Sequence, residues 1–468
     1  MVAIYGGPPL GDDRALTETS VPRGNCPDRE NHATLKRPRQ THATSVRKNG
    51  VNIGNVAVSR QSLPKRTSPL RVAVVGGGLA GCCAALELAL AGCKVTLYER
   101  QPELLSRAAV ANEGKLHLGY VYAGDPGLAT ARRMVAGALS FQPLMRRLLG
   151  LDALDLNPSS AFIYAVHRES QIPPDQVGAY LQAVHRLIDE AAHERGSYFG
   201  VDLAAPPHVL GRGEIARHYD TGEIVAAFQT PEIAIDPLVL APLIEKRVRE
   251  EPAIERRTAT EVTGFAETDG KLEVMTRDGG RHRFDRVVNA AWENRLALDA
   301  TLGLHPPRQW FHRFKYGVRF RPLSPARTPC TTLVLGPFGD VVVYASGEVY
   351  MSWYPAGLAT ASEELVVPYR PTRPAVSEAD RLVRGTVEGL CDIVPGLRAM
   401  KAADGAYAVR GGQIIAWGQT DIDDPGSGLH ARSMIGVSAQ GRYFSLDPGK
   451  LTTAPFFARR CAEAVLAS

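Results

Sequence analysis

The hydrophobic pattern is clearest between residues 71 and 100. The apolar run Val72–Val75 ends in a glycine-rich stretch, a longer apolar segment follows over 80–91, and a second short apolar run covers 95–98. Short apolar runs next to glycine are typical of buried strands, whereas the longer segment has the length of a helix. The pattern therefore predicts a strand, a glycine turn, a helix and a second strand.

Helical and strand-like patterns alternate along the rest of the chain. Asp236, followed by proline, and Ser377 are expected to cap helices. Gly114 and Gly119 bracket a segment that is too turn-prone for a regular helix. Helices are expected at 130–149, 177–195, 238–248 and 377–392, with a last helix ending at Ala467. Strands are expected at 161–166, 260–264, 271–276, 281–284, 286–291, 315–320, 340–344 and 349–354, and strand-like residues at 433–438. This alternation predicts an α/β fold, and the change of pattern over 151–232 indicates a first passage through a second domain.

The length of 468 residues allows two to three domains, and the net charge of +5 at first suggests a nucleic-acid partner. Residues 1–68 hold eleven Lys and Arg against five Asp and Glu, so the remainder carries −1. Because the surplus lies in this segment, a phosphate-backbone partner for the body is disfavoured. The segment 1–68 is expected to be a disordered basic tail, either an organellar transit segment or an upstream extension.

The seven cysteines are odd in number and form no CxxC pair. This usage predicts reduced, mostly buried thiols in a reducing compartment, and no metal site. The chain has no apolar run long enough to span a membrane and no secretory signal pattern. A cytoplasmic protein is expected, and the tail leaves organellar targeting open.

The glycine turn carries a dinucleotide-binding pattern. Gly76, Gly78 and Gly81 stand at the GxGxxG positions, and Glu99 ends the second strand. Gly76 permits the tight turn, Gly78 lets the backbone approach a pyrophosphate, and Gly81 lets the helix lie close to the sheet. Glu99 can accept hydrogen bonds from ribose hydroxyls and disfavours a 2′-phosphate. Taken alone, this stretch predicts an adenine dinucleotide and leaves NAD, NADP and FAD open.

The order of the motifs carries a resemblance to a known family. The GxGxxG unit, Ile235-Asp236-Pro237, Val287-Val288-Asn289-Ala290 and a glycine-bearing loop before the last helix occur in sequence. Over about 70–468 the chain resembles the D-amino-acid-oxidase-like (DAO-type) FAD-dependent oxidoreductases. The stretches 115–119 and 449–453 are similar to FAD-dependent glycerol-3-phosphate dehydrogenases, and 112–137 is similar to 2-hydroxyglutarate oxidases. Two stretches depart from the family pattern, Trp292-Glu293-Asn294-Arg295 and Ala439-Gln440-Gly441-Arg442.

The resemblance implies a Rossmann-like FAD-binding domain, with a parallel sheet, helices and a β-meander, plus a discontinuous β-rich substrate cap. The FAD-binding domain would comprise 69–150, 233–304 and 401–468, and the cap 151–232 and 305–400. It also implies FAD rather than NAD, because the last helix returns to the flavin. The residues expected to bind FAD are Gly76, Gly78, Leu79, Ala80, Gly81, Glu99, Arg100, Asn112, Gly114, Lys115, Leu116, Val262, Gly441, Arg442, Lys450, Leu451 and Thr452. Among them, the Lys450 ammonium would stabilise negative charge at N1 and O2 of reduced flavin.

Three residues are candidates for chemistry. His117 lies in the segment expected beside the isoalloxazine and can accept a substrate proton; the alternatives are a packed histidine or covalent attachment to the flavin. Arg410 is a candidate carboxylate clamp, with Arg319 as a weaker second; the alternative for Arg410 is a surface arginine. Tyr354 is a candidate cavity wall, and strand aromatics are more often core residues.

The leading hypothesis is an FAD-dependent oxidoreductase. It takes a hydride from a C–H next to an amine or hydroxyl of a small acidic substrate and passes electrons to oxygen or a carrier. The alternatives are a flavin-dependent tailoring or redox-neutral enzyme and a non-catalytic dinucleotide-binding sensor. The sequence leaves the oligomeric state open.

Overall fold

The computed structural model describes residues 68–195, 198–400 and 407–468. The predicted disordered tail falls, except for Ser68, outside the described residues, and so do residues 401–406 of the predicted third FAD-binding segment. The described residues belong to one compact unit, so the division into an FAD-binding domain and a cap stays a prediction. The sheets nevertheless show which strands lie together.

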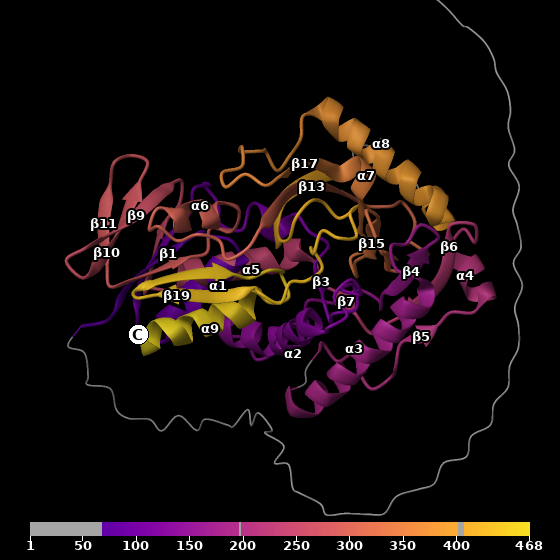
Figure 1. The fold of residues 1–468 in the computed structure, drawn as a ribbon, viewed down its shortest axis with the longest axis horizontal. Coiled ribbons are helices and arrows are strands. Elements are labelled where there is room, and N and C mark those ends of the chain that lie inside the picture. The colour runs from indigo at the N-terminus through magenta and orange to yellow at the C-terminus, as the bar shows by residue number, and fades with distance from the viewer. Residues whose placement is uncertain (1–67, 196–197, 401–406) are drawn as a thin grey trace, which may run out of the picture. The chain divides into compact units, whose positions relative to one another are not determined.

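A six-stranded sheet is built around the first strand of the glycine motif (Figure 1). Five of its strands are parallel, and only the edge strand β19 is antiparallel. In order across the sheet the strands are β19 (Gly436–Gln440), β20 (Tyr443–Asp447), β12 (Arg286–Asn289), β1 (Arg71–Val75), β2 (Lys94–Tyr98) and β8 (Ile254–Arg257). The predicted α/β fold is confirmed, and the six strands come from three stretches of the sequence that lie far apart, 71–98, 254–289 and 436–447. Since carboxyl ends of parallel strands share one edge, ligands are expected there.

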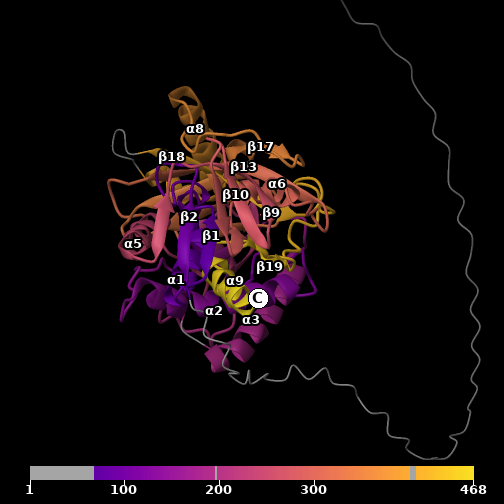
Figure 2. The same cartoon turned by 90° about the vertical axis from the view of Figure 1, so that its left-hand side faces the viewer.

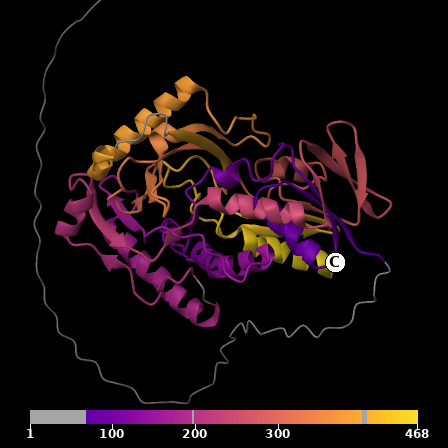
Figure 3. The same ribbon diagram turned by 180° about the vertical axis from the view of Figure 1, so that it is seen from behind.

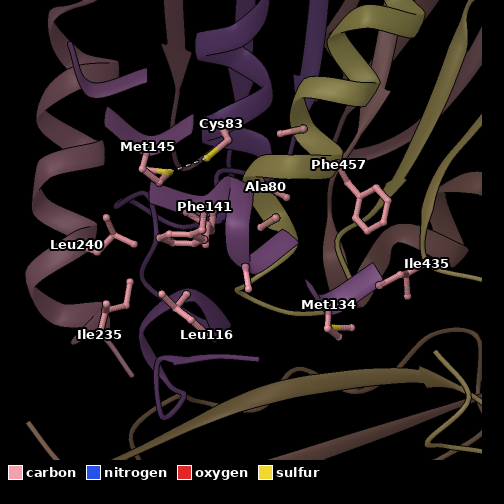
Figure 4. Packing of buried hydrophobic residues seen from close by; sticks show 14 of the residues in the cluster. Ala80, Cys83, Leu116, Met134, Phe141, Met145, Ile235, Leu240, Ile435 and Phe457 are labelled. Carbon is pink, nitrogen blue, oxygen red and sulfur yellow. Dashed lines mark hydrogen bonds between the residues drawn. The ribbon is translucent and has the colours of Figure 1, made fainter. Parts of the chain in front are cut away.

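The helix after the glycine turn, α1 (Leu79–Leu90), is buried on nearly all sides. It packs against α9 (Ala454–Ala467) and α5 (Pro237–Glu250), so both later segments return to the motif that opens the fold. Figure 4 shows the packing between these helices and α2 (Ala129–Leu149), where Cys83 Sγ lies 3.9 Å from Met145 Sδ. None of the six described cysteines forms a disulfide, all six are buried, and burial raises the pKa of the Cys83 thiol.

The predicted β-meander is present as an antiparallel sheet of three strands. These are β9 (Val262–Thr268), β10 (Lys271–Thr276) and β11 (Arg281–Phe284). Phe265 of β9 packs against Tyr443 of β20, with ring centroids 5.2 Å apart. The meander therefore continues the core of the six-stranded sheet.

A nine-stranded sheet forms the second half of the molecule. Its order is β17 (Leu358–Ser362), β13 (Trp310–Phe320), β16 (Val349–Trp353), β15 (Gly339–Val343), β14 (Thr331–Val334), β4 (Ile163–His167), β6 (Ile224–Gln229) and β5 (His208–Val209), with β18 (Ala408–Trp417) paired to β13. β18 pairs with β13 along its whole length. Residues 408–417, predicted to lie with the FAD-binding segment, therefore belong to this sheet, and the six-stranded sheet resumes only at Gly436.

Several helices cover the nine-stranded sheet and its flank. α8 (Val376–Ile393) packs on β13, β16 and β18, away from α9 in Figures 2 and 3. The other elements are η1 (Ala108–Val110), β3 (Lys115–Leu116), α3 (Pro174–Arg195), α4 (Arg212–His218), β7 (Ile233–Ala234), η2 (Trp292–Asn294), α6 (Arg295–Ala300), α7 (Tyr354–Gly357) and η3 (Pro395–Ala399). Within the described residues, no helix is both long and apolar enough to cross a bilayer, and no cluster of His, Cys, Asp and Glu could hold a metal.

The two predicted helix caps have different outcomes. Asp236 is the N-cap of α5, and its carboxylate accepts a hydrogen bond of 2.9 Å from the Leu238 amide, as predicted. Ser377 was the wrong cap for α8, whose N-cap is Ala375 without a side-chain bond. The reason is that the Ala379 amide already donates to the Ala375 carbonyl, so the first turn closes before Ser377.

A buried histidine in β13 is expected to make the fold sensitive to acid. His312 is fully buried, neither ring nitrogen has a hydrogen-bond partner, and burial, reinforced by Arg295, lowers its pKa to about 4. The unfolded chain binds a proton at this histidine near pH 6.5, whereas the folded protein binds it only near pH 4. The stability that neutral His312 contributes above pH 6.5 is therefore lost as the pH falls toward 4. Urea unfolding of the wild type should show a loss of about 3 kcal/mol from this group. His312→Phe should flatten the profile between pH 6.5 and 4, and an equally steep profile would contradict the prediction.

Candidate active site

One cavity opens at the carboxyl ends of β1, β2 and β12 and extends to the nine-stranded sheet. Its lining combines the glycine turn, the loop 105–117, the stretch 290–294 and the segment before α9 with residues of β13, β14, β15 and β18. Segments that are hundreds of residues apart in sequence therefore form one site. This is the position at which a parallel sheet with helices on its faces binds its ligand.

The glycine turn is shaped for a close ligand. Gly76 has φ +104°, and a Cβ there would lie 2.5 Å from the Ala290 carbonyl oxygen. A Cβ on Gly81 would lie 1.8 Å from the Gly76 oxygen, whereas a Cβ on Gly78 would meet nothing within 4 Å. α1 begins after Gly78 without a side-chain cap, so its first amide groups are free of a capping side chain. A backbone cradle at an uncapped helix N-terminus fits a diphosphate.

An acid and two arginines define the next part of the wall. Glu99 accepts hydrogen bonds from the Gly77 amide at 2.7 Å and the Gln101 amide at 2.8 Å. Burial raises its pKa, and these two bonds oppose that shift. Arg100 is paired with Glu293, and Arg107 Nη2 lies 2.9 Å from the same carboxylate. The departure from the family pattern at Trp292-Glu293 thus gives a charged bridge across this end of the cavity.

Most residues predicted to hold FAD lie at the cavity. Those that line it are Gly76, Gly78, Leu79, Ala80, Glu99, Arg100, Asn112, Lys115, Val262, Lys450 and Leu451. The predicted residues outside the lining include Gly81, Gly114, Leu116 and Thr452. Thr452 supports the wall, since its hydroxyl accepts from the His117 amide at 2.8 Å and donates to the Lys115 carbonyl at 3.1 Å. Direct contact of each residue with FAD stays a prediction.

Two predicted FAD contacts require correction. Gly441 and Arg442 form the turn between β19 and β20, before β20 begins. Because β20 is parallel to β12, its amino end lies at the sheet edge opposite the cavity. The segment that reaches the cavity is instead His430 and Arg432, before β19. None of the motifs found in the sequence marks this loop.

The predicted arginine clamp does not lie in the cavity wall. Arg410 is on β18 but outside the lining, to which the following Gly412 and Gln413 contribute. Arg319, the second candidate, is held by Asp236 at 2.8 Å and Glu348 at 2.7 Å. The cavity contains Arg313 of β13 instead, almost fully buried, 3.6 Å from Asp421 and hydrogen-bonded to the Tyr354 hydroxyl.

Positive charge gathers in the part of the cavity around Arg313. Arg313, Lys315, Arg432 and Lys450 line it, and Lys315 hydrogen-bonds to Ser352 at 3.3 Å. Among the described residues, no carboxylate lies within ion-pair distance of Arg432, Lys315 or Lys450. Burial, with Arg432 next, lowers the pKa of Lys450 to about 7. By contrast, Lys115 is paired with Asp340 at 2.7 Å, and its pKa is raised because this partner and nearby acids outweigh burial.

His117 lies on the cavity wall between two carboxylates. Its Nε2 is 3.7 Å from Glu113 Oε1, and its Nδ1 is 3.6 Å from Glu232 Oε1. Glu113 also lines the cavity, and its pKa is well below the usual value because His117 and nearby lysines outweigh burial. Sequence reasoning found His117 and missed Glu232, which carries no motif signal beyond standing just before Ile235-Asp236-Pro237.

Fold and cavity together define a dinucleotide-binding α/β protein with a charged second site beside the cofactor cradle. A family model described as FAD dependent oxidoreductase (DAO) matches residues 71–425. The chain belongs to this family, so it is an FAD-dependent oxidoreductase, and the predicted family, enzyme class and cofactor are confirmed.

Solved structures of low sequence identity share the fold. Glycine oxidase from Geobacillus kaustophilus has a TM-score of 0.59 and 15% identity, covering 84% of this chain and 95% of its own. Glycerophosphate oxidase from Mycoplasma pneumoniae, described with FAD bound, has a TM-score of 0.58 and 18% identity, covering 85% and 95%. Iminodiacetate oxidase from Chelativorans sp. BNC1 has a TM-score of 0.59 and 19% identity, covering 85% and 96%.

Curated relatives match over short stretches only. The tRNA 5-methylaminomethyl-2-thiouridine biosynthesis bifunctional protein MnmC of Pseudomonas paraeruginosa (strain DSM 24068 / PA7) is 41% identical over 75 residues, 16% of this chain and 11% of the relative. The FAD-dependent monooxygenase FPY4 of Fusarium mangiferae is 34% identical over 79 residues, 17% of this chain and 20% of the relative. The matches therefore span a fifth or less of these relatives, and their activities do not carry over to this chain.

Proposed function

We propose that this enzyme removes a hydride from a C–H next to an amine or hydroxyl of a small anionic substrate. FAD, when bound, supplies the ring that accepts the hydride at N5, and oxygen or a carrier later reoxidises it. The observation that carries the substrate class is the buried Arg432, which lacks a carboxylate partner among the described residues and stands in the cavity with Lys315 and Lys450.

Burial removes these cations from water. A buried cation costs several kcal/mol unless an anion pairs with it. One of the unpaired cations, Lys450, is expected to meet the flavin pyrimidine, which leaves Arg432 and Lys315 for the substrate. Arg313 stands beside them and is shared with Asp421 at 3.6 Å. A guanidinium binds carboxylate or phosphate oxygens in a fixed, bidentate geometry, so an acidic substrate would be oriented as well as attracted.

His117 is the group proposed to take the proton. Its ring lies in the cavity wall, and the cation group lies in the same cavity. As the hydride leaves carbon, the adjacent O–H or N–H becomes acidic, and a neutral imidazole can accept its proton. Tyr354, bonded to Arg313 and also in the wall, would hold the guanidinium in place and exclude water.

The anion site can be tested by replacing its unpaired cations. Arg432→Met and Lys315→Met should each weaken binding of small mono- and dicarboxylates, followed by the change in flavin absorbance, by at least about tenfold, since a hydrogen bond to a charged group contributes about 1.5–3 kcal/mol. Arg410→Ala, outside the wall, is the matched control and should bind as the wild type does. If Arg410→Ala weakens binding while the two Met variants do not, the clamp predicted from sequence replaces this assignment.

The proposed reaction is tested by a substrate screen on the yellow holoprotein. An amine or 2-hydroxy acid that is a substrate should bleach the flavin absorbance anaerobically, and peroxide on readmission of air would identify oxygen as the acceptor. A redox-neutral tailoring enzyme would turn over without net peroxide or loss of reducing equivalents. Failure of every acidic amine and hydroxy acid to bleach the flavin would overturn the proposal.

A further inference from the structure

We propose that Glu232 is a positioning residue that keeps the proton of neutral His117 on Nδ1 and leaves Nε2 as the basic atom. The role as base rests on the proposed function, but the tautomer does not. In the reaction, the substrate would lose a hydride to FAD and a proton to His117 Nε2, which leaves a C=O or C=N bond in the product. The imidazolium formed would then lie between two carboxylates, Glu232 and Glu113.

Glu232 is held rigidly on the far side of the ring from the cavity. It is fully buried, in the turn between β6 and β7, and it is not part of the cavity lining. One oxygen, Oε2, accepts from the Leu118 amide at 2.6 Å, and the other, Oε1, accepts from the Tyr164 hydroxyl at 2.5 Å. Burial and Glu232 raise the pKa of Tyr164, so its hydroxyl keeps its proton and donates. Both donors fix the carboxylate without using all its lone pairs.

His117 is fixed just as firmly. Its amide donates to Thr452 Oγ1 at 2.8 Å, and the next amide, of Leu118, donates to Glu232 itself. The ring is 4% exposed, and Nδ1 is buried without a hydrogen-bond partner. The acidic atom facing Nδ1 is Glu232 Oε1 at 3.6 Å. Catalytic hydrogen bonds are often long without substrate and shorten in the complex, so this acceptor is the one toward which an Nδ1 proton would point.

The opposite nitrogen faces the reacting side. Nε2 lies 3.7 Å from Glu113 Oε1, and Glu113 is part of the cavity wall. Which nitrogen of a histidine is protonated follows from the hydrogen bond that the other one makes. In the proposed tautomer the Nδ1 proton points at Glu232, and Nε2 carries the lone pair on the side of the cavity and of Glu113. Lys115 and Lys450 lie near Glu113, and their positive charges offset the repulsion between the Glu113 carboxylate and the substrate anion.

The test reads the ring directly, by ¹⁵N NMR of histidine-labelled holoprotein. The His117 signals are assigned from their absence in His117→Gln. The wild type should show the Nδ1–H tautomer at high pH. Glu232→Gln should lose this preference, because a neutral amide oxygen is a poorer acceptor for the Nδ1 proton than a carboxylate oxygen. Its kcat should fall with KM little changed.

Two control variants separate positioning from general disturbance. Tyr164→Phe removes a bond to Glu232 but keeps the carboxylate, so the His117 tautomer should persist. Glu87→Gln alters another buried glutamate, which lies on α1 and is paired with Arg147 of α2, and it should leave His117 unchanged. An unchanged His117 tautomer in Glu232→Gln would overturn the proposal even if activity were lost. If the NMR result is as expected but His117→Gln remains active, the pairing stands and the proposed function of His117 fails.

Discussion

Replacing His117 by glutamine should slow anaerobic reduction of the flavin by substrate by about 10²–10⁴-fold, the usual contribution of a general base. Glutamine keeps a polar side chain of similar reach, and the backbone bond from residue 117 to Thr452 does not depend on the side chain. FAD should therefore stay bound at wild-type stoichiometry. The measurement is stopped-flow bleaching at saturating substrate, with FAD content read from the absorbance of denatured protein.

His167→Gln provides the matched control for that experiment. His167 is another buried histidine beside a glutamate, with Nε2 3.0 Å from Glu223, but it lies on β4 outside the cavity lining. Its replacement should leave the rate of bleaching within a factor of about two. Wild-type bleaching by His117→Gln would remove this residue from the chemistry and favour the interpretation as a packed histidine.

Alanine substitutions at two glycines of the cradle, Gly78 and Gly81, should have different effects. Gly78→Ala keeps φ −75°, which alanine adopts readily, and its Cβ meets no protein atom within 4 Å. The fold should survive, and the methyl group should occupy the space that the FAD diphosphate needs. We expect FAD affinity to drop by at least about tenfold, as overpacking costs about 1–3 kcal/mol. Titration of apoprotein with FAD, followed by flavin fluorescence, measures this.

Gly81→Ala should instead damage the fold itself. Its Cβ would lie 1.8 Å from the Gly76 carbonyl oxygen, and α1 would have to move away from the sheet. The apoprotein should unfold at a lower temperature even without FAD. Gly213→Ala is the control, because a Cβ at this glycine in α4 meets nothing within 4 Å and lies far from the cradle. Equal FAD affinity in Gly78→Ala and Gly213→Ala would show that the diphosphate does not approach Gly78.

Local patterns predicted much of the fold because their physical causes are local. The apolar run, glycine spacing and acid at Glu99 all act within thirty residues, and the structure has the strand, turn and helix where they were expected. The Asp236 cap was equally local. The error at Ser377 arose because a backbone hydrogen bond closed the turn earlier, which side-chain preference alone does not show.

The sequence by itself determined the cofactor cradle: three glycines, the uncapped start of α1 and an acid at the end of β2 follow from spacing within one unit. Only the tertiary structure decided what faces the cofactor. β18 pairs with β13 in the nine-stranded sheet, and Gly412 and Gln413 of β18 line the cavity together with Arg313 of β13, whereas Arg410 does not. Likewise Glu232, over one hundred residues from His117, meets its ring only through folding. Side-chain direction depends on sheet register, because a slip of one residue turns every side chain of a strand to the other face. Which residues of distant strands meet is therefore decided only when the strands pair.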